Sequence, residues 1–136
     1  MRLYLDANVF IFAALGDNAD SRTQKAQAVL SRIIERKDTG FTSVLTIDEV
    51  VWVILKRKKD RDLAIDQGLR LLKLPIIRLP CSEPVSFKGL QLMRKYSQLS
   101  PRDAIHAATC IEIEGAAFVS DDKDFEGLEE IKHLKL

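Results

Sequence analysis

Short apolar segments alternate along this chain with longer segments of helical periodicity. Strand-like segments, short and rich in β-branched, aromatic or leucine residues, lie at 2–5, 41–43, 76–79, 116–119 and 131–134. Apolar residues that recur every three to four positions predict helices at about 9–15, 21–37, 46–59, 60–74, 85–96 and 100–115. Because strands and helices alternate, the sequence predicts an α/β fold with a mainly parallel sheet and helices on both faces.

Polar residues at the predicted helix starts support these boundaries. Ser21 is expected to cap the second helix, and Thr46 with Glu49 has the spacing of a capping box at the start of the third. Ser100 is followed by Pro101 at the first helical position and by Asp103 three residues after the cap. Each of these acids therefore has a purely local explanation.

The predicted third helix has an unusual interior. Residues 50–55 read VVWVIL and are apolar on every side of a helix. Such a helix is either central in the core or buried in a contact between subunits. The basic run at residues 56–59 suits the negative end of the helix dipole, although a nuclease would also use such a run to contact phosphates.

Composition narrows the class of protein. The 136 residues suit a single domain, 1–136, with 46% hydrophobic and 30% charged residues and no run long enough to cross a membrane. The first strand follows Met1 directly, so we expect no leader sequence and a cytoplasmic protein. Cys81 and Cys110 lack metal-ligand spacing and are expected to be small buried thiols. The net charge of +1 confines any nucleic-acid binding to local patches.

The first candidate for chemistry is Asp6, which directly follows the strand at 2–5. In parallel α/β sheets ligands bind at the carboxyl edge of the strands, where this carboxylate is predicted to lie. Asp and Asn are also common helix caps, so Asp6 and Asn8 have the alternative role of starting the next helix.

Three more acids occupy comparable positions in other segments. Asp122 follows the strand at 116–119, and Glu49 and Asp103 lie in the first turns of helices that follow loops. Local capping does not require four separate segments to bring an acid to one sheet edge, and a shared site explains the coincidence.

A gathered set of carboxylates needs protons or cations to offset its mutual repulsion. Hard oxygen ligands favour Mg²⁺ or Mn²⁺ over zinc. The sequence offers no Ser or Cys nucleophile paired with His and an acid, so water activated by a metal is the expected attacker on a phosphodiester. His106, one turn after Asp103, is interpreted as a structural neighbour and left out of the chemistry.

Four motifs together resemble the acidic motifs of PIN domains. They are Leu5-Asp6-Ala7-Asn8-Val9, Thr46-Ile47-Asp48-Glu49-Val50, the segment 99–108 (LSPRDAIHAA) and the segment 119–125 (VSDDKDF). The resemblance covers essentially the whole chain. A short form with the first Asp near the N-terminus looks most like VapC-type toxins of toxin-antitoxin pairs.

This resemblance implies a three-layer α/β/α sandwich, a Mg²⁺- or Mn²⁺-dependent ribonuclease, an RNA substrate, a homodimer and a VapB-like antitoxin as partner. By residue, it implies catalytic and metal-binding roles for Asp6, Glu49, Asp103 and Asp122. The supporting polar residues would be Asn8 and Ser120, with Asp124 as the reserve candidate for the last acid.

Other functions remain open at the level of sequence. A PIN-type nuclease could process RNA without an antitoxin, and the acids could be caps in a non-catalytic domain that binds a partner. A haloacid-dehalogenase-like phosphatase also starts with an acid after its first strand. Asn8 stands where that family needs its second Asp, so the chain fits that class poorly.

Overall fold

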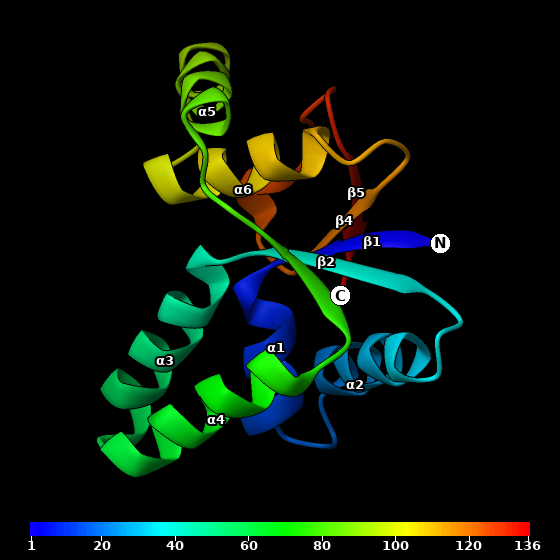
Figure 1. Cartoon of the computed structure of the whole chain (residues 1–136), viewed down its shortest axis with the longest axis vertical. Coiled ribbons are helices and arrows are strands. Elements are labelled where there is room, and N and C mark those ends of the chain that lie inside the picture. The colour runs from blue at the N-terminus through cyan, green and yellow to red at the C-terminus, as the bar shows by residue number, and fades with distance from the viewer.

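A computed structural model describes residues 1–136, and its centre is a five-stranded sheet (Figure 1). The strands are β1 (Arg2–Leu5), β2 (Thr39–Ser43), β3 (Ile76–Leu79), β4 (Ala117–Ser120) and β5 (Lys132–Lys135). Their order across the sheet is β3-β2-β1-β4-β5, and every neighbouring pair is parallel. The predicted parallel sheet is confirmed, and β1 lies at its middle.

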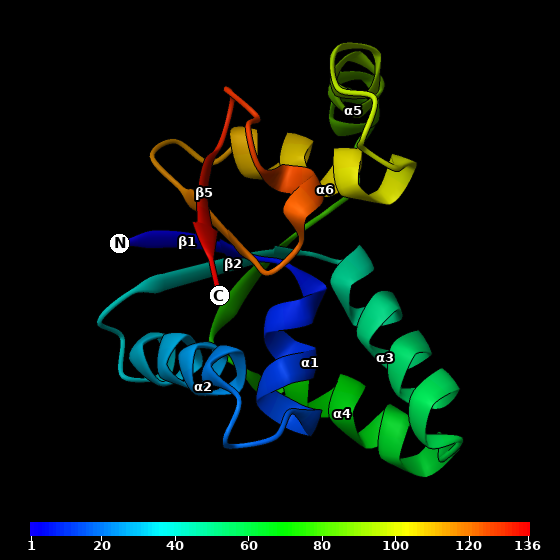
Figure 2. The ribbon, with the colours of Figure 1, turned by 180° about the vertical axis from the view of Figure 1, so that it is seen from behind.

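Helices cover both faces of the sheet, which confirms the predicted three layers. One face carries α1 (Ala7–Leu15), α2 (Ser21–Ile34), α3 (Leu45–Lys58) and α4 (Arg61–Lys73), seen below the sheet in Figures 1 and 2. The other carries α5 (Glu83–Lys95), α6 (Pro101–Ile111) and a short 3-10 turn, η1 (Lys123–Phe125). None of these helices is both long and apolar enough to cross a membrane.

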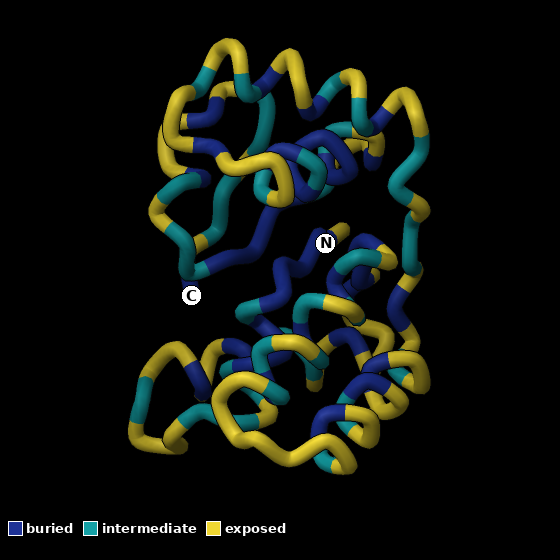
Figure 3. Tube along the Cα trace, turned by 90° about the vertical axis from the view of Figure 1, so that its left-hand side faces the viewer, coloured by how far each residue is buried: buried dark blue, intermediate teal, exposed yellow.

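Alternation along the central strands divides the core in two. In β1, Leu3 and Leu5 pack with the helices of the α1 face, whereas Tyr4 packs with α5 and α6. In β4, Val119 and Phe118 divide between the two faces in the same way. Both strands are buried in the middle of the molecule, with the exposed turns of the helices outside them (Figure 3).

Several helix ends follow the predicted chemistry, and two do not. Ser100 caps α6 by accepting a hydrogen bond from the Asp103 amide, as predicted. The prediction that Ser21 caps α2 is wrong, because Asp20 accepts the Arg22 amide and Ser21 is already helical. An aspartate one residue earlier can reach the free amides of the first turn, which is what the cap requires.

The predicted capping box at Thr46 is also wrong. Helix α3 begins at Leu45 after Val44, with no side-chain cap, and Thr46 is buried with its hydroxyl 2.7 Å from that of Thr42. Tertiary burial therefore decides the position of Thr46, and Glu49 is released from a capping role.

Other differences are smaller. Helix α1 starts at Ala7 rather than Val9, and α2 ends at Ile34, before Arg36 turns into the left-handed region at φ 59°. In the apolar run of α3, Val50 and Ile54 are buried while Trp52 keeps 55% of its surface exposed. Core burial thus explains part of this run only. Both cysteines are free thiols, and Cys110 is the buried one.

Candidate functional site

The site begins where β1 ends beside β4. Asp6 follows β1, and its amide donates a hydrogen bond to the carbonyl of Val119 at 3.1 Å. Asp6 is 7% exposed, and its side chain accepts a hydrogen bond from the Ala7 amide at 2.7 Å, so Asp6 is the N-cap of α1. Because parallel strands end at one edge, the cap position also directs this carboxylate to the edge where the other segments arrive.

Two polar side chains hold the outer oxygen of Asp6. The Ser120 hydroxyl donates to Oδ2 at 2.7 Å, and the Asn8 amide nitrogen donates to the same oxygen at 3.1 Å. The same Asn8 nitrogen lies 3.0 Å from Ser120 Oγ, which closes a triangle of three side chains from two segments. Asn8 and Ser120, the predicted supporting residues, thus both contact Asp6, and their part in the chemistry stays a prediction.

The loop after β4 is folded around Ser120. Its hydroxyl accepts the Asp122 amide at 3.0 Å, and Asp122 Oδ1 in turn accepts the Asp124 amide at 2.9 Å. Asp121 is turned toward Arg22, with 3.1 Å between the carboxylate and the guanidinium. This arrangement separates the crowded acids of the last motif, because Asp121 is used in an ion pair.

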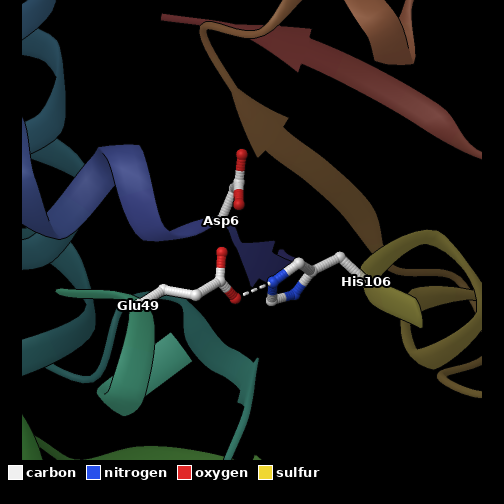
Figure 4. A group of neighbouring side chains, drawn as sticks. All are labelled: Asp6, Glu49 and His106. Atoms are coloured by element: carbon white, nitrogen blue, oxygen red, sulfur yellow. Dashed lines mark hydrogen bonds and ion pairs between the residues drawn. The ribbon is translucent and has the colours of Figure 1, made fainter. Parts of the chain in front are cut away.

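Glu49 reaches the site from α3 and meets His106 of α6 (Figure 4). The imidazole Nε2 is in hydrogen-bond contact with Glu49 Oε1, and Nδ1 lies 2.7 Å from the Tyr4 hydroxyl. His106 is 1% exposed. A ring held at both nitrogens has one orientation, so His106 fixes the position of one Glu49 oxygen.

The side chains form two groups that could each hold a cation. Asp6, Glu49 and His106 make one, and Asp103, Asp122 and Asp124 make the other, with the potential ligand atoms of each group within 4.8 Å of one another. Carboxylate oxygens dominate both groups, and this is the donor chemistry that Mg²⁺ and Mn²⁺ prefer. The residues present therefore fit a hard divalent cation.

Burial and mutual repulsion alter the pKa values in this site. Burial raises the pKa of Asp6 above its ordinary value, against opposing effects of His106, Ser120 and the Ala7 amide. Burial likewise raises the pKa of Asp103, opposed by the bond with Ser100, and the nearby Asp122 and Asp6 add to the rise. Burial lowers the pKa of His106, but the bond with Glu49 and the charges of Asp6, Glu49 and Asp103 outweigh it and give a net rise. Raised carboxylate pKa values such as those of Asp6 and Asp103 are typical of functional sites.

All seven residues singled out in the sequence come together at this edge, but their grouping was not foreseen. Asp124 joins Asp103 and Asp122 instead of replacing either one. His106, interpreted from the sequence as a structural neighbour outside the chemistry, contacts Glu49 directly. Its spacing of three residues from Asp103 was the available signal, since residues three apart share a helix face.

A comparison with known families bears on what this site belongs to. The family model described as PIN domain matches residues 3–131, nearly the whole chain. The chain belongs to the PIN domain family. At the level of sequence, no curated protein matches it significantly.

Solved structures resemble this PIN domain over its full length. VapBC2 from Rickettsia felis, bound to a promoter DNA fragment, has a chain with a TM-score of 0.73 and 18% identity, with 100% of this chain and 99% of that chain covered. VapC20 from Mycobacterium tuberculosis, a toxin that cleaves the sarcin-ricin loop, has a TM-score of 0.68 and 16% identity. The match covers 95% of this chain and 98% of that chain. FitAcB from Neisseria gonorrhoeae has a TM-score of 0.68 and 20% identity, with 98% of this chain and 96% of that chain covered. At these identities the similarity establishes the fold.

Proposed function

We propose that this PIN domain is a ribonuclease that depends on Mg²⁺ or Mn²⁺ and acts as the toxin of a VapBC-type pair. The observation that carries the proposal is the convergence of carboxylates from four segments on one sheet edge, in two groups with cation-binding spacing. Asp6, Glu49, Asp103 and Asp122 are the proposed metal-binding and catalytic residues, with Asp124 and the hydrogen-bonded Asn8 and Ser120 in support.

The bound cation would supply an activated water and offset the charge of the phosphodiester. The protein contributes the arrangement. Asp6 is buried and held by Ala7, Asn8 and Ser120, so its oxygens need no reorganisation on binding. Glu49 is held by His106 and is only partly exposed, so one carboxylate oxygen is in contact with the imidazole while the other is available to a ligand or a proton.

Partners follow from the kind of protein proposed. The matching solved structures include VapBC from Salmonella typhimurium bound to DNA and a toxin-antitoxin complex from Klebsiella pneumoniae. We propose single-stranded RNA as substrate, a VapB-like antitoxin as inhibitor and a homodimer as the assembly. A soluble, cytoplasmic protein is proposed on the same grounds.

Cleavage assays test the proposed activity. Purified protein should cleave single-stranded RNA with Mg²⁺ or Mn²⁺ and stop when a chelator is added. Asp6→Asn and Asp103→Asn should each lower turnover by about a hundredfold or more, because each removes a cation ligand. Asp66→Asn, an exposed acid on α4, is the matched control and should cleave like the wild type.

The same assay separates the alternatives. A phosphatase would hydrolyse small phosphomonoesters and leave internal phosphodiesters intact, and a domain that only binds a partner would cleave neither. Turnover near the wild-type rate in Asp6→Asn would show that the site is assigned to the wrong residues. Co-expression with its VapB-like antitoxin should abolish cleavage, as expected for the toxin of such a pair.

A further inference from the structure

An exposed aromatic and basic surface lies on the outer side of α3. Trp52, Val53, Lys56 and Arg57 line a shallow hollow of about 370 Å³, which we call the Trp52 surface. The indole is 55% exposed, and Lys56 Nζ lies 4.8 Å from its ring centroid. A single exposed apolar side chain would need no explanation, but here the ring is combined with two exposed cations on one surface.

The Trp52 surface is continuous with the candidate site through the helix. Trp52, Val53 and Lys56 follow Glu49 by three, four and seven residues, so all four lie along one side of α3. At about 1.5 Å of rise per residue, the indole lies roughly one turn from Glu49 along the axis, and Lys56 about two turns. Figure 1 shows α3 starting just past the end of β2 and running outward from the sheet edge, so this track leads away from the acids.

The charges on the Trp52 surface are free to meet an anion. Lys56 and Arg57, and the following Lys58 and Lys59, are exposed, and none of them lies within ion-pair distance of an acid. The dipole of α3 accounts for basic residues at this end. The helix dipole does not account for the exposed indole of Trp52, which lies next to the Lys56 ammonium group.

Single-stranded nucleic acid matches this combination better than a second copy of the chain. Surfaces that bind single strands combine aromatic rings, on which bases stack, with cations that contact the backbone. A symmetric contact between two copies would place the same patch against itself, and the unpaired cations would then repel one another.

We propose that the Trp52 surface is a binding subsite for the RNA strand beside the cleaved phosphodiester, with one base stacked on the indole and phosphates contacted by Lys56 and Arg57. The proposal rests on the ribonuclease function above and adds the residues that position the strand. Stacking on an aromatic face tolerates any base, so this subsite contributes affinity and alignment more than sequence preference.

Intrinsic fluorescence tests the stacking directly, because Trp52 is the only tryptophan of the chain. Full-length protein in chelator, which prevents cleavage, is titrated with a ten-nucleotide oligouridylate. Saturable quenching of the Trp52 emission is expected, with affinity that falls as salt is added. An RNA duplex of the same length should quench much less, since its bases are already stacked on one another.

Variants assign the contributions. With a fluorescein-labelled strand followed by anisotropy, Trp52→Ala should weaken binding about tenfold and Trp52→Phe much less, because phenylalanine keeps a stacking face. The Lys56→Gln, Arg57→Gln double variant should bind more weakly and flatten the dependence of affinity on salt. Leu69→Ala and Lys73→Gln, both exposed on α4, are the matched controls and should bind like the wild type.

Two results would overturn the proposal. The first is RNA that binds by anisotropy while the Trp52 emission stays unchanged. The second is an emission that shifts with protein concentration, with Trp52→Ala becoming monomeric, which would assign the surface to a second copy. Binding is measured without catalysis, so the two proposals fail separately. Quenching without any cleavage in Mg²⁺ or Mn²⁺ would contradict the ribonuclease proposal and leave the Trp52 surface as a surface that binds single-stranded RNA.

Discussion

At the scale of single residues, Asp6 combines a structural and a chemical role. It caps α1 through the Ala7 amide, and the same carboxylate contacts Asn8 and Ser120 and lies near enough to Asp103 to raise the pKa of that acid. Its burial raises its pKa, so ionised Asp6 reduces the stability of the fold when no cation is bound. Protonation of Asp6 or binding of a metal ion therefore removes the free-energy cost of burying its charge.

Replacing Asp6 with Asn should stabilise the metal-free protein while removing activity. An acid whose folded pKa is raised contributes most to stability below its unfolded pKa of about 4, and this contribution is lost as pH rises through the folded pKa. At pH 7.5 in chelator, Asp6→Asn should therefore unfold at a temperature a few degrees higher, corresponding to about 1 kcal/mol. Mn²⁺ should raise the melting temperature of the wild type more than that of the variant. Equal shifts in both proteins would remove Asp6 from the cation site.

His106 should act through Glu49. Its net raised pKa means that the contact with Glu49 stabilises the fold below about pH 6.5, and that this stability is lost as pH rises through the folded pKa. Urea unfolding between pH 5.5 and 8.5 should show this decline in the wild type and a flatter profile in His106→Gln. In cleavage assays, adding His106→Gln to Glu49→Gln should cost little more than Glu49→Gln alone, since both disturb one carboxylate. Fully additive losses would mean that His106 acts independently of Glu49.

At the scale of elements, α6 places both Asp103 and His106 at the site. Its start is set by Ser100, which accepts the Asp103 amide at 3.3 Å, and by Pro101 in the first turn. Small residues, Ala104, Ala107 and Ala108, are fully buried behind these side chains and allow the helix to lie close to the sheet.

Removing the cap of α6 should therefore affect activity as well as stability. Ser100→Ala should cost about 1 kcal/mol in the free energy of unfolding and should also lower cleavage, because the first turn carries Asp103. Ser82→Ala is the matched control, since Ser82 caps α5 through the Val85 amide at the same distance of 3.3 Å and carries no acid of the site. Denaturant unfolding and cleavage rates measure both effects. Similar cleavage by the two variants would show that the α6 cap does not position Asp103.

At the scale of the whole molecule, large apolar side chains are exposed on several elements, and the two most exposed of them lie on α5. Val50 and Ile54 of α3 are used in the core, which explains part of the apolar run at residues 50–55 and leaves Trp52 exposed. On α5, Phe87 and Leu90 remain 65% and 66% exposed. Because these are the two most exposed apolar side chains, we propose the α5 face as the contact of the homodimer.

Light scattering across a dilution series tests this assembly. The wild type should be dimeric at micromolar concentration, and Leu90→Glu should be monomeric, because a charge cannot be buried against its own symmetry copy without a partner. Leu69→Glu places the same charge on an exposed leucine of α4 and should stay dimeric. A wild type that is monomeric at micromolar concentration would count against the homodimer, and a dimeric Leu90→Glu would assign the contact to another face.

The sequence by itself determined the order of strands and helices, the cap at Ser100 and the candidate acids that meet at one sheet edge. These features depend on local periodicity, on hydrogen bonds within one turn and on residue type, and all of these can be read along the chain. The acids could be named because each follows a strand or opens a helix, and parallel strands bring such positions to one edge.

Only the tertiary structure decided which of these residues meet. Glu49 pairs with His106, which is 57 residues away in the sequence. Thr46 does not cap α3, because its side chain is buried against Thr42. The sequence likewise left undecided which of residues 50–55 are buried, since a helix that is apolar all round has no preferred face. In the structure, neighbouring segments cover Val50 and Ile54 and leave Trp52 exposed. Contacts between segments depend on strand order and helix docking, which the local pattern of a single sequence does not encode.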